Sequence, residues 1–262
     1  MEIPITLPIN KIADEAKDVK TFYFRYRLNS KPGQFVNLWI PGVDEKPFSV
    51  SWQDENEFAV SVQKIGGFTE KLFGMKKGSL LGIRGPYGNG FKIEGKNILL
   101  VGGGCGCGPL AFLADEAVKR KIKVNFIMGA RSGINLLFLG RMKKIANAIA
   151  VTDDGSFGFK GFATSAMEEF LKNKKIDKVF SCGPEMMMKK VAEICKRNKI
   201  KCELSLERHM KCGFGVCGQC CVDKTGWRVC KEGPVFSLEQ VKQITEFGNY
   251  KRDATGKKVF FK

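Results

Sequence analysis

Residues 98–109 read Ile98-Leu-Leu-Val101-Gly-Gly-Gly-Cys-Gly-Cys-Gly-Pro109, an apolar run followed by a turn that is mostly glycine. The run has the length of a buried strand, and residues 109–120 continue in a helical pattern. Glycines at such a strand-to-helix junction let the phosphates of a dinucleotide approach the backbone and the N-terminus of the helix. The spacing is not the Gly-x-Gly-x-x-Gly of a Rossmann site. The sequence nevertheless predicts nucleotide-binding glycines, which are Gly102, Gly103, Gly104 and Gly106.

Downstream of this junction, short apolar runs alternate with helical stretches. The runs cover residues 124–128, 148–151 and 177–181, and a clear helical stretch covers 184–198. Buried strands that alternate with helices predict a doubly wound parallel sheet. A second strand-to-helix junction reads Cys182-Gly183-Pro184. Because ligands of such sheets bind at the carboxyl ends of the strands, we expect the two junctions to flank one nicotinamide site.

Residues 1–95 show the pattern of short β-strands separated by turns. Stretches such as 21–26, 34–39 and 58–62 are rich in aromatic and β-branched residues, and Pro-Gly or Gly-Pro pairs punctuate the region. Several short strands at this spacing predict a small antiparallel barrel.

Two short motifs in the barrel region suit a flavin nucleotide. In the first, a basic residue could hold a phosphate, an aromatic ring could stack on the flavin, and a hydroxyl could reach the reactive ring nitrogen. Its residues are Lys46, Pro47, Phe48 and Ser49. In the second, backbone N–H groups at a helix start suit a pyrophosphate, and its residues are Gly66, Gly67 and Thr69. Taken alone, the first motif is more typical of an ordinary strand, and the second fits a hairpin turn equally well.

Five of the ten cysteines lie within residues 212–230, which is typical of a metal site rather than of a secreted disulfide scaffold. Three of them follow the spacing Cys-x4-Cys-x2-Cys and a fourth comes later, as in plant-type [2Fe–2S] sites. Interleaved glycines let such a loop curl and point N–H groups at the sulfurs. The predicted ligands are Cys212, Cys217, Cys220 and Cys230. Structural zinc is the alternative, and Cys221 could take the place of Cys220.

The composition argues against several other classes of function. A single histidine, His209, is incompatible with multi-histidine metal centres and Ser-His-Asp hydrolysis. The net charge of +17 comes from residues scattered along the chain without a zinc-finger or RNP pattern, so we expect no nucleic-acid partner. The sequence has no apolar run of about 18 residues. Its start also lacks the features of a signal peptide. We therefore expect a cytoplasmic protein without a membrane partner.

Taken together, these motifs resemble the ferredoxin-reductase-like flavoproteins over essentially the whole chain. Among them, the closest likeness is to the electron-transfer subunits of dihydroorotate dehydrogenase type B. The most specific stretch is Glu207-Arg-His-Met-Lys-Cys-Gly-Phe-Gly-Val-Cys-Gly-Gln-Cys220, completed by Val229-Cys-Lys-Glu-Gly-Pro-Val-Phe236. The resemblance also rests on residues 46–50, 85–91, 102–110, 152–158 and 252–256.

The resemblance implies three domains and three cofactors. An FAD-binding β-barrel would cover residues 1–95, a nicotinamide-binding α/β domain 96–206, and a [2Fe–2S] domain with the C-terminal tail 207–262. The cofactors would be FAD, a [2Fe–2S] cluster and NAD, and the residues identified above would be ligands and positioning groups rather than catalytic ones.

The resemblance also implies a partner, an FMN-containing catalytic subunit that oxidises dihydroorotate to orotate. The two kinds of subunit would form a heterotetramer with two copies of each. Electrons would pass from the partner's FMN through the cluster and FAD to NAD⁺, within de novo pyrimidine biosynthesis. This chain alone would hold no dihydroorotate site.

Two alternatives remain open. Similar chains serve as diaphorase subunits of NADH-dependent ferredoxin:NADP oxidoreductases, sulfide dehydrogenases and some hydrogenases, which differ in the partner rather than in the cofactors. The other alternative is a zinc-bearing binding module on a non-catalytic nucleotide-binding scaffold. Such a module would be colourless, whereas flavin and cluster together would give a brown-yellow protein.

Overall fold

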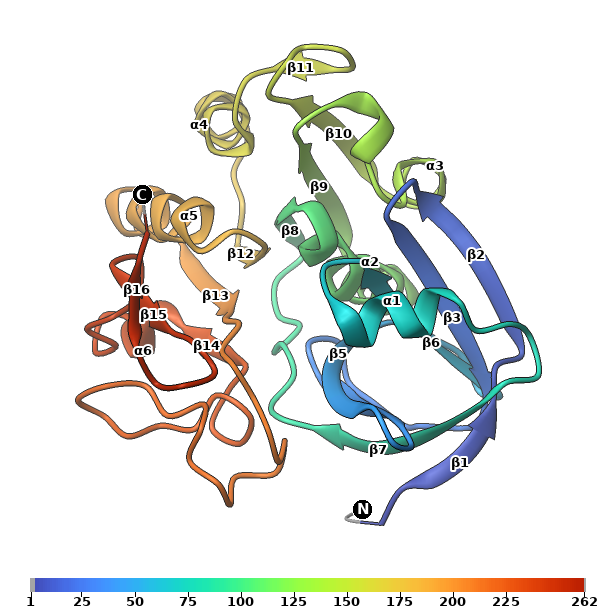
Figure 1. Ribbon diagram of the computed structural model, residues 1–262. Helices are drawn as coiled ribbons and strands as arrows, with labels where there is room; N and C mark the ends of the chain where they lie inside the picture. Colours follow the sequence, from blue (N-terminus) through green and yellow to red (C-terminus); the bar gives the residue numbers. More distant parts are fainter. Residues whose placement is uncertain (1–2, 262) are drawn as a thin grey trace.

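The N-terminal strands form one curled antiparallel sheet (Figure 1). The computed structural model describes residues 3–261. Seven strands pair in the order β1-β7-β4-β5-β6-β3-β2. Their bounds are β1 (Ile5–Pro8), β2 (Lys11–Ala16), β3 (Val19–Arg25), β4 (Phe35–Ile40), β5 (Asp44–Gln53), β6 (Glu57–Gln63) and β7 (Leu80–Tyr87). Because β1 and β2 lie at the two edges, the predicted barrel takes the form of a half-barrel, with helix α1 (Gly67–Phe73) between β6 and β7.

Aromatic side chains fill the inside of the half-barrel. Phe24 of β3 lies opposite Phe58 of β6 in the ladder, and their ring centroids are 5.2 Å apart. Both are fully buried, as is Phe22. Alternate residues of a strand point to opposite faces, so the two-residue period places these rings on one side. Each buried phenylalanine stabilises the fold by about 1.5–3 kcal/mol.

The central part of the chain forms a second, mostly parallel sheet. Its seven strands pair in the order β11-β10-β9-β8-β12-β13-β14. Their bounds are β8 (Asn97–Gly103), β9 (Lys123–Ala130), β10 (Asn147–Thr152), β11 (Phe159–Lys160), β12 (Lys178–Cys182), β13 (Lys201–Ser205) and β14 (Val235–Ser237). The strand order reverses between β8 and β12, which is the switch point where a doubly wound sheet binds ligands. The predicted fold class is confirmed.

Helices cover both faces of this sheet. On one side lie α2 (Cys107–Lys119) and α3 (Leu139–Met142), and on the other lie α4 (Ala163–Asn173) and α5 (Glu185–Arg197). The residues of β8 alternate between the two cores: Ile98 and Leu100 pack with α2, and Leu99 and Val101 pack with α4 and α5. Burial on both faces explains why these strands are continuous apolar runs.

The C-terminal part of the chain packs against this second sheet rather than standing apart. Strand β14 pairs antiparallel with β13, and helix α6 (Leu238–Val241) follows it. The hairpin of β15 (Tyr250–Arg252) and β16 (Lys258–Phe260) comes last. In Figure 1 the long loop between β13 and β14 extends towards the end of β7. A segment this small thus shares the core of its neighbour, with Cys220, Val222 and Val229 in the cluster that also contains α5.

The helices of the described chain are short. The two longest, α2 and α5, have 13 residues each. Within residues 3–261, no helix combines the length and apolar character needed to cross a membrane.

Candidate functional site

The loop between β13 and β14 carries the four cysteines that the spacing predicts as cluster ligands. Cys217 lies close enough to Cys212 to lower its pKa, and Cys230 lies close enough to Cys220 to do the same. All ten cysteines are free of disulfides. Within residues 3–261, no group of three or more His, Cys, Asp or Glu side chains is arranged to hold a metal ion. Cys212 with Cys217 and Cys220 with Cys230 are called the thiol pairs below, and Cys212 also lies close enough to Cys220 and Cys230 to influence both.

The first thiol pair lies in a loop whose backbone points towards the sulfur. The N–H of Val216 donates to Sγ of Cys212 at 3.4 Å. Burial would raise the pKa of Cys212, but the N–H groups of the loop outweigh this effect and lower the pKa to about 6. The loop thus favours the thiolate, which is the form of cysteine that binds iron.

The second thiol pair is more deeply buried. The N–H of Cys230 donates to Sγ of Cys220 at 3.4 Å. Hydrogen bonds from the side chain and backbone of Cys230 lower the pKa of Cys220 to about 7, against the effect of burial. The pKa of Cys230 moves upward, because its proton is shared with Cys220 and because burial disfavours a second charge. Cys221 lies outside the pair, and burial raises its pKa.

The two motifs predicted to bind flavin lie together on the half-barrel. Phe48 of β5 stacks on Phe68 of α1, with ring centroids 6.0 Å apart. Lys46 of β5 forms an ion pair with Asp44 at 2.5 Å. The hydroxyl of Thr69 accepts a hydrogen bond from the N–H of Gly66 at 3.0 Å, so its direct contact is with the start of α1.

The start of α1 has open space beside its backbone. A Cβ added at Gly66 or Gly67 would meet no atom within 4 Å. Packing therefore does not require glycine at either position, and a ligand could occupy the space. The pyrophosphate site stays a prediction, because the N–H of Gly66 already donates to Thr69 and the open space shows only that a ligand has room.

The two glycine junctions touch each other at the switch point between β8 and β12. A Cβ on Gly106 would lie 2.3 Å from the carbonyl oxygen of Cys182, and one on Gly103 would lie 2.8 Å from Cδ of Pro184. A Cβ on Gly183 would lie 2.9 Å from the backbone nitrogen of Gly103. These glycines are thus needed for loop-to-loop contact. The structure brings together the two junctions that the sequence predicts to flank one nicotinamide site.

The remaining predicted glycines differ in their surroundings. A Cβ on Gly102 would lie 2.8 Å from Sγ of Cys107, so this glycine serves packing. Gly104 has a φ of +53° and open space around it. Of the four predicted glycines Gly102, Gly103, Gly104 and Gly106, Gly104 therefore leaves the most room for a ligand.

Three thiols lie at the same junctions. Burial raises the pKa of Cys105 to about 12 and that of Cys182 to about 12, and it raises the pKa of Cys107 as well. Cys105 also donates to Oε1 of Gln63 on β6 at 3.8 Å. These thiols stay protonated at neutral pH, so the two junctions carry no thiolate charge.

Sequence reasoning missed the residues that join the loop of the thiol pairs to the half-barrel. Nδ2 of Asn37, on β4, donates to the carbonyl oxygen of Cys212 at 3.2 Å. The guanidinium of Arg84, on β7, lies 5.5 Å from the ring centroid of Phe214. Asn89 donates to the carbonyl oxygens of Lys231 and Glu232 at 3.1 and 2.9 Å. The one available signal was a polar residue at position 37 in the otherwise apolar strand Phe35–Ile40.

A buried ion network joins the later junction to the same loop. Nη1 of Arg208 donates to Glu185 at 2.6 Å, and its Nε donates to Glu246 at 2.7 Å. Glu185 is the first residue of α5, directly after the junction Cys182-Gly183-Pro184. Glu246 also accepts from the N–H of Asp223 at 2.8 Å. No sequence motif indicates a role for these charges.

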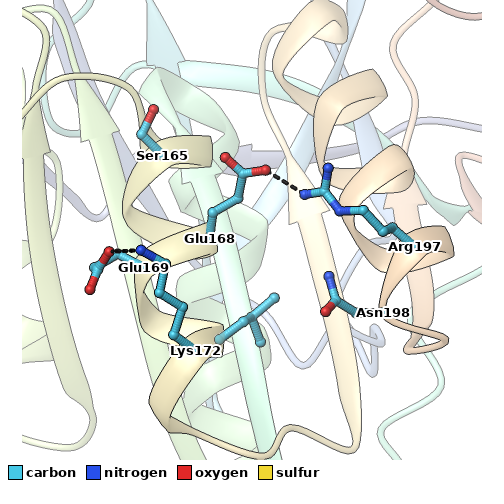
Figure 2. Close-up of a pocket in the computed structure, with 7 residues that line it drawn as sticks. Ser165, Glu168, Glu169, Lys172, Arg197 and Asn198 are labelled. Carbon is cyan, nitrogen blue, oxygen red and sulfur yellow. Dashed lines mark hydrogen bonds and ion pairs between the residues drawn. The ribbon is translucent and has the colours of Figure 1, made fainter.

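A surface groove between α4 and α5 lies away from these junctions (Figure 2). It measures about 430 Å³. Two ion pairs lie along it, Arg197 with Glu168 at 2.5 Å and Lys172 with Glu169 at 2.7 Å. Helix α5 starts at the carboxyl end of β12 and is about 20 Å long. Its last residue, Arg197, therefore lies at the opposite end of the sheet from the predicted nicotinamide site.

Comparison with known families and proteins agrees with this arrangement. A family model for the iron-sulfur cluster binding domain of dihydroorotate dehydrogenase B matches residues 207–242, the range that contains both thiol pairs. A protein of Methanocaldococcus jannaschii is 49% identical over 261 residues, which cover 100% of this chain and 100% of the relative. It is named probable dihydroorotate dehydrogenase B (NAD(+)), electron transfer subunit. A protein of Methanothermobacter thermautotrophicus with the same name is 47% identical, over 99% of this chain and 98% of the relative.

Solved structures share the fold as well. The structure of an NADH-dependent reduced ferredoxin-NADP oxidoreductase, studied for flavin-based electron bifurcation, superimposes with a TM-score of 0.82 at 29% identity. The match covers 92% of this chain and 93% of that one. The cytochrome P450 reductase of Amycolatopsis superimposes with a TM-score of 0.67 at 24% identity, over 76% of this chain and 68% of that one, which shows the fold alone.

Proposed function

The chain belongs to the family of electron transfer subunits of dihydroorotate dehydrogenase B, and on that premise we propose how it works. It is the electron transfer subunit of an NAD-dependent oxidoreductase of pyrimidine biosynthesis, with an iron–sulfur domain on a reductase fold. A separate FMN-containing catalytic subunit oxidises dihydroorotate, and this chain passes the electrons to NAD⁺. The two kinds of subunit assemble as a heterotetramer with two copies of each.

The residues of the chain fit three redox groups. A [2Fe–2S] cluster is assigned to Cys212, Cys217, Cys220 and Cys230. FAD is assigned to Lys46, Pro47, Phe48, Ser49, Gly66, Gly67 and Thr69. The nicotinamide nucleotide is assigned to Gly102, Gly103, Gly104, Gly106, Cys182, Gly183 and Pro184. A flavin exchanges hydride with a nicotinamide and single electrons with an iron–sulfur cluster, so it connects the two kinds of carrier.

The protein groups bind and orient. Phe48 and Phe68 offer an aromatic surface, and the open backbone at Gly66 and Gly67 leaves room for phosphates. Lys46 supplies a positive charge, which is paired with Asp44 and would have to exchange that partner for a phosphate. The protonated thiols of Cys105 and Cys182 keep the nicotinamide crevice free of negative thiolate charge.

The arrangement of the cysteines in two pairs is the observation that carries the proposed cluster type. A two-iron cluster with four cysteine ligands takes two thiolates on each iron. The thiol pairs Cys212 with Cys217 and Cys220 with Cys230 match that division. A structural zinc ion instead needs four ligands around one centre, so the content of zinc or of iron and sulfide in the purified chain distinguishes the two.

The test is a visible spectrum of the anaerobically purified native complex before and after addition of dihydroorotate. We expect the flavin and cluster bands to bleach, and NAD⁺ to restore them. Orotate, the product, serves as the control and should bleach neither band. A complex that dihydroorotate leaves unchanged, while NADH bleaches both bands, would contradict the proposed substrate and leave the cofactor assignments in place.

That second outcome would favour a diaphorase subunit of another complex. The superposition on an NADH-dependent reduced ferredoxin-NADP oxidoreductase, at a TM-score of 0.82, supports this candidate. Its cofactors would be the same and its partner different. Reduction of NADP⁺ by NADH together with reduced ferredoxin in the native complex, without any response to dihydroorotate, is the result expected of it.

A further inference from the structure

We infer that Asn37 is a positioning residue that holds the first cluster cysteine, Cys212, against β4, the strand paired with the strand of the flavin motif. The inference rests on the proposed function, because it takes Cys212 as a ligand of the cluster. It adds a residue that neither the cysteine spacing nor the flavin motif contains.

Asn37 reaches the cluster loop from the middle of β4. Asn37 is only 1% exposed. Its Nδ2 donates to the carbonyl oxygen of Cys212 at 3.2 Å, although the two residues are 175 positions apart in the sequence. A buried side chain thus bonds the backbone of a predicted ligand directly.

The neighbouring residue, Gly213, makes this contact close. A Cβ on Gly213 would lie 2.8 Å from Nδ2 and 3.1 Å from Oδ1 of Asn37. Gly213 also has a φ of +83°, a conformation that favours glycine. The loop backbone therefore packs on the amide at a distance that a residue with a Cβ could not reach without a shift.

The strand that carries Asn37 is paired with the strand of the flavin motif. In the ladder between β4 and β5, Asn37 lies opposite Pro47, which is flanked by Lys46 and Phe48. One side-chain hydrogen bond and one strand pairing thus connect Cys212 to the predicted flavin residues. A change at Asn37 would alter how the cluster loop sits relative to β5.

The amide oxygen of Asn37 indicates that a gain in stability alone does not explain why asparagine stands at this position. Oδ1 of Asn37 is buried and has no hydrogen-bond donor among the described residues. A buried acceptor without a donor destabilises the folded state, whereas an apolar side chain of similar shape would not. The contribution of this side chain therefore lies in the bond from Nδ2 to Cys212.

The test compares the full-length chain, loaded with FAD and cluster, with the variant Asn37→Leu. Leucine has a similar shape and removes both the donor and the unpaired acceptor. We expect only a small change in the unfolding temperature, because the lost bond to Cys212 and the removal of the unpaired acceptor act in opposite directions. Its reduced cluster should show shifted g-values in the EPR spectrum, and NADH should reduce the cluster about tenfold more slowly, the effect typical of groups that orient a metal ligand. Reduction of ferricyanide by NADH, which needs only the flavin, should change little.

Two further variants complete the design. Thr21→Val is the matched control, because Thr21 is a buried polar residue of the same sheet whose hydroxyl bonds Glu15 and Ser61 rather than the cluster loop. It should alter the unfolding temperature and leave the EPR spectrum unchanged. Gly213→Ala pushes the loop away from Asn37 without altering the amide, and it should shift the g-values as Asn37→Leu does.

The outcomes separate the inference from the proposed function. Unshifted g-values and an unchanged rate of cluster reduction in Asn37→Leu would overturn the role of Asn37 alone. If Asn37→Leu fails to fold, unshifted g-values in Gly213→Ala would overturn it equally. An unmodified chain that binds no iron would overturn the proposed cluster, and the inference with it.

Discussion

Among single residues, Cys220 and Cys221 give a sharp test of ligand choice. Of these two residues, Cys220 is the one next to Cys230, and the N–H of Cys230 donates to Sγ of Cys220. We therefore expect Cys220→Ser to lose nearly all bound iron and sulfide, since one iron would keep a single thiolate. Cys221→Ser should keep both at the level of the unmodified chain. Iron and sulfide per chain after anaerobic purification decide the matter, and the reverse pattern would move the ligand to Cys221.

The thiol of Cys105 gives a prediction on pH. Burial raises its pKa from 9.0 to about 12, so it stays protonated over the range in which an ordinary cysteine ionises. Iodoacetamide reacts with the thiolate, so the labelling rate should rise about tenfold per pH unit from 7 to 10 without a plateau. Above pH 9 the unfolded chain loses this proton while the folded chain keeps it. The contribution of Cys105 to the free energy of unfolding therefore decreases as the pH rises above 9. Mass spectrometry of the labelled peptide measures the rate, with glutathione as reference, and a plateau near pH 9 would contradict the prediction.

Whether the role of a single residue could be predicted depends on how far apart in the sequence its contacts lie. An iron–sulfur domain was predictable because three cysteines lie in one loop with a recognisable spacing, while the choice of Cys212, Cys217, Cys220 and Cys230 as ligands stays a prediction. Asn37 was not, because its partner Cys212 is 175 residues away and only the folded chain brings them together. The same holds for Asn89, which bonds carbonyl oxygens 142 and 143 residues away.

Among the structural elements, the contact between the two glycine junctions can be tested by adding one methyl group. In Gly106→Ala the new Cβ would lie 2.3 Å from the carbonyl oxygen of Cys182, so the loops after β8 and β12 must separate. We expect a loss of about 1–3 kcal/mol in the free energy of unfolding. Binding of NADH should weaken at the same time. Urea unfolding and a fluorescence titration with NADH measure the two effects.

A glycine of a neighbouring helix serves as the control for that substitution. Gly140 lies in α3, where an added Cβ would meet no atom within 4 Å. Gly140→Ala should leave NADH binding unchanged and stabilise the chain by up to about 1 kcal/mol, because alanine favours the helix. If Gly106→Ala and Gly140→Ala changed the free energy of unfolding and the binding of NADH equally, the close contact between the two junctions would not be required.

The elements were predictable where burial follows a regular period. The apolar runs predicted strands of the parallel sheet, and the helical stretch 184–198 corresponds to α5 (Glu185–Arg197). Strand β14 was not predicted, because its three residues pair with β13 across the whole loop of the thiol pairs. The half-barrel was expected as a barrel, since the pattern of strands does not reveal whether the edge strands β1 and β2 meet. The domain bounds at residues 95 and 206 stay predictions.

Across the whole molecule, the loop of the thiol pairs contacts both other parts of the chain. It touches the half-barrel through Asn37 and Arg84, and it is tied to α5 through Arg208 and Glu185. The same segment leads into β14, which pairs with β13 in the second sheet. The loop that would hold the proposed cluster is therefore fixed in place by both other parts of the chain, and its contact with the half-barrel suits transfer of electrons from the cluster to the predicted flavin.

The ion network around Arg208 should stabilise the contact between α5 and the loop of the thiol pairs. The side chains of Arg208, Glu185 and Glu246 are only 3%, 7% and 1% exposed. Removal of the guanidinium in Arg208→Met leaves two buried carboxylates without their cation, which costs about 3–5 kcal/mol. In Arg197→Met, the matched loss of an exposed ion pair with Glu168 (Figure 2), the cost should stay below about 1 kcal/mol. Urea unfolding of both variants in the full-length chain measures the difference.

A third variant distinguishes lost charge balance from lost packing in the same network. Arg208→Met combined with Glu185→Gln and Glu246→Gln removes all three charges, so the large penalty of an uncompensated buried charge no longer applies. We expect it to regain a substantial part of the stability that Arg208→Met loses. If the triple variant is as unstable as the single one, the guanidinium acts through packing and its hydrogen bonds. If Arg208→Met costs no more than Arg197→Met, the network does not hold α5 to the loop of the thiol pairs, and the contact through Asn37 and the pairing of β14 remain to fix that loop in place.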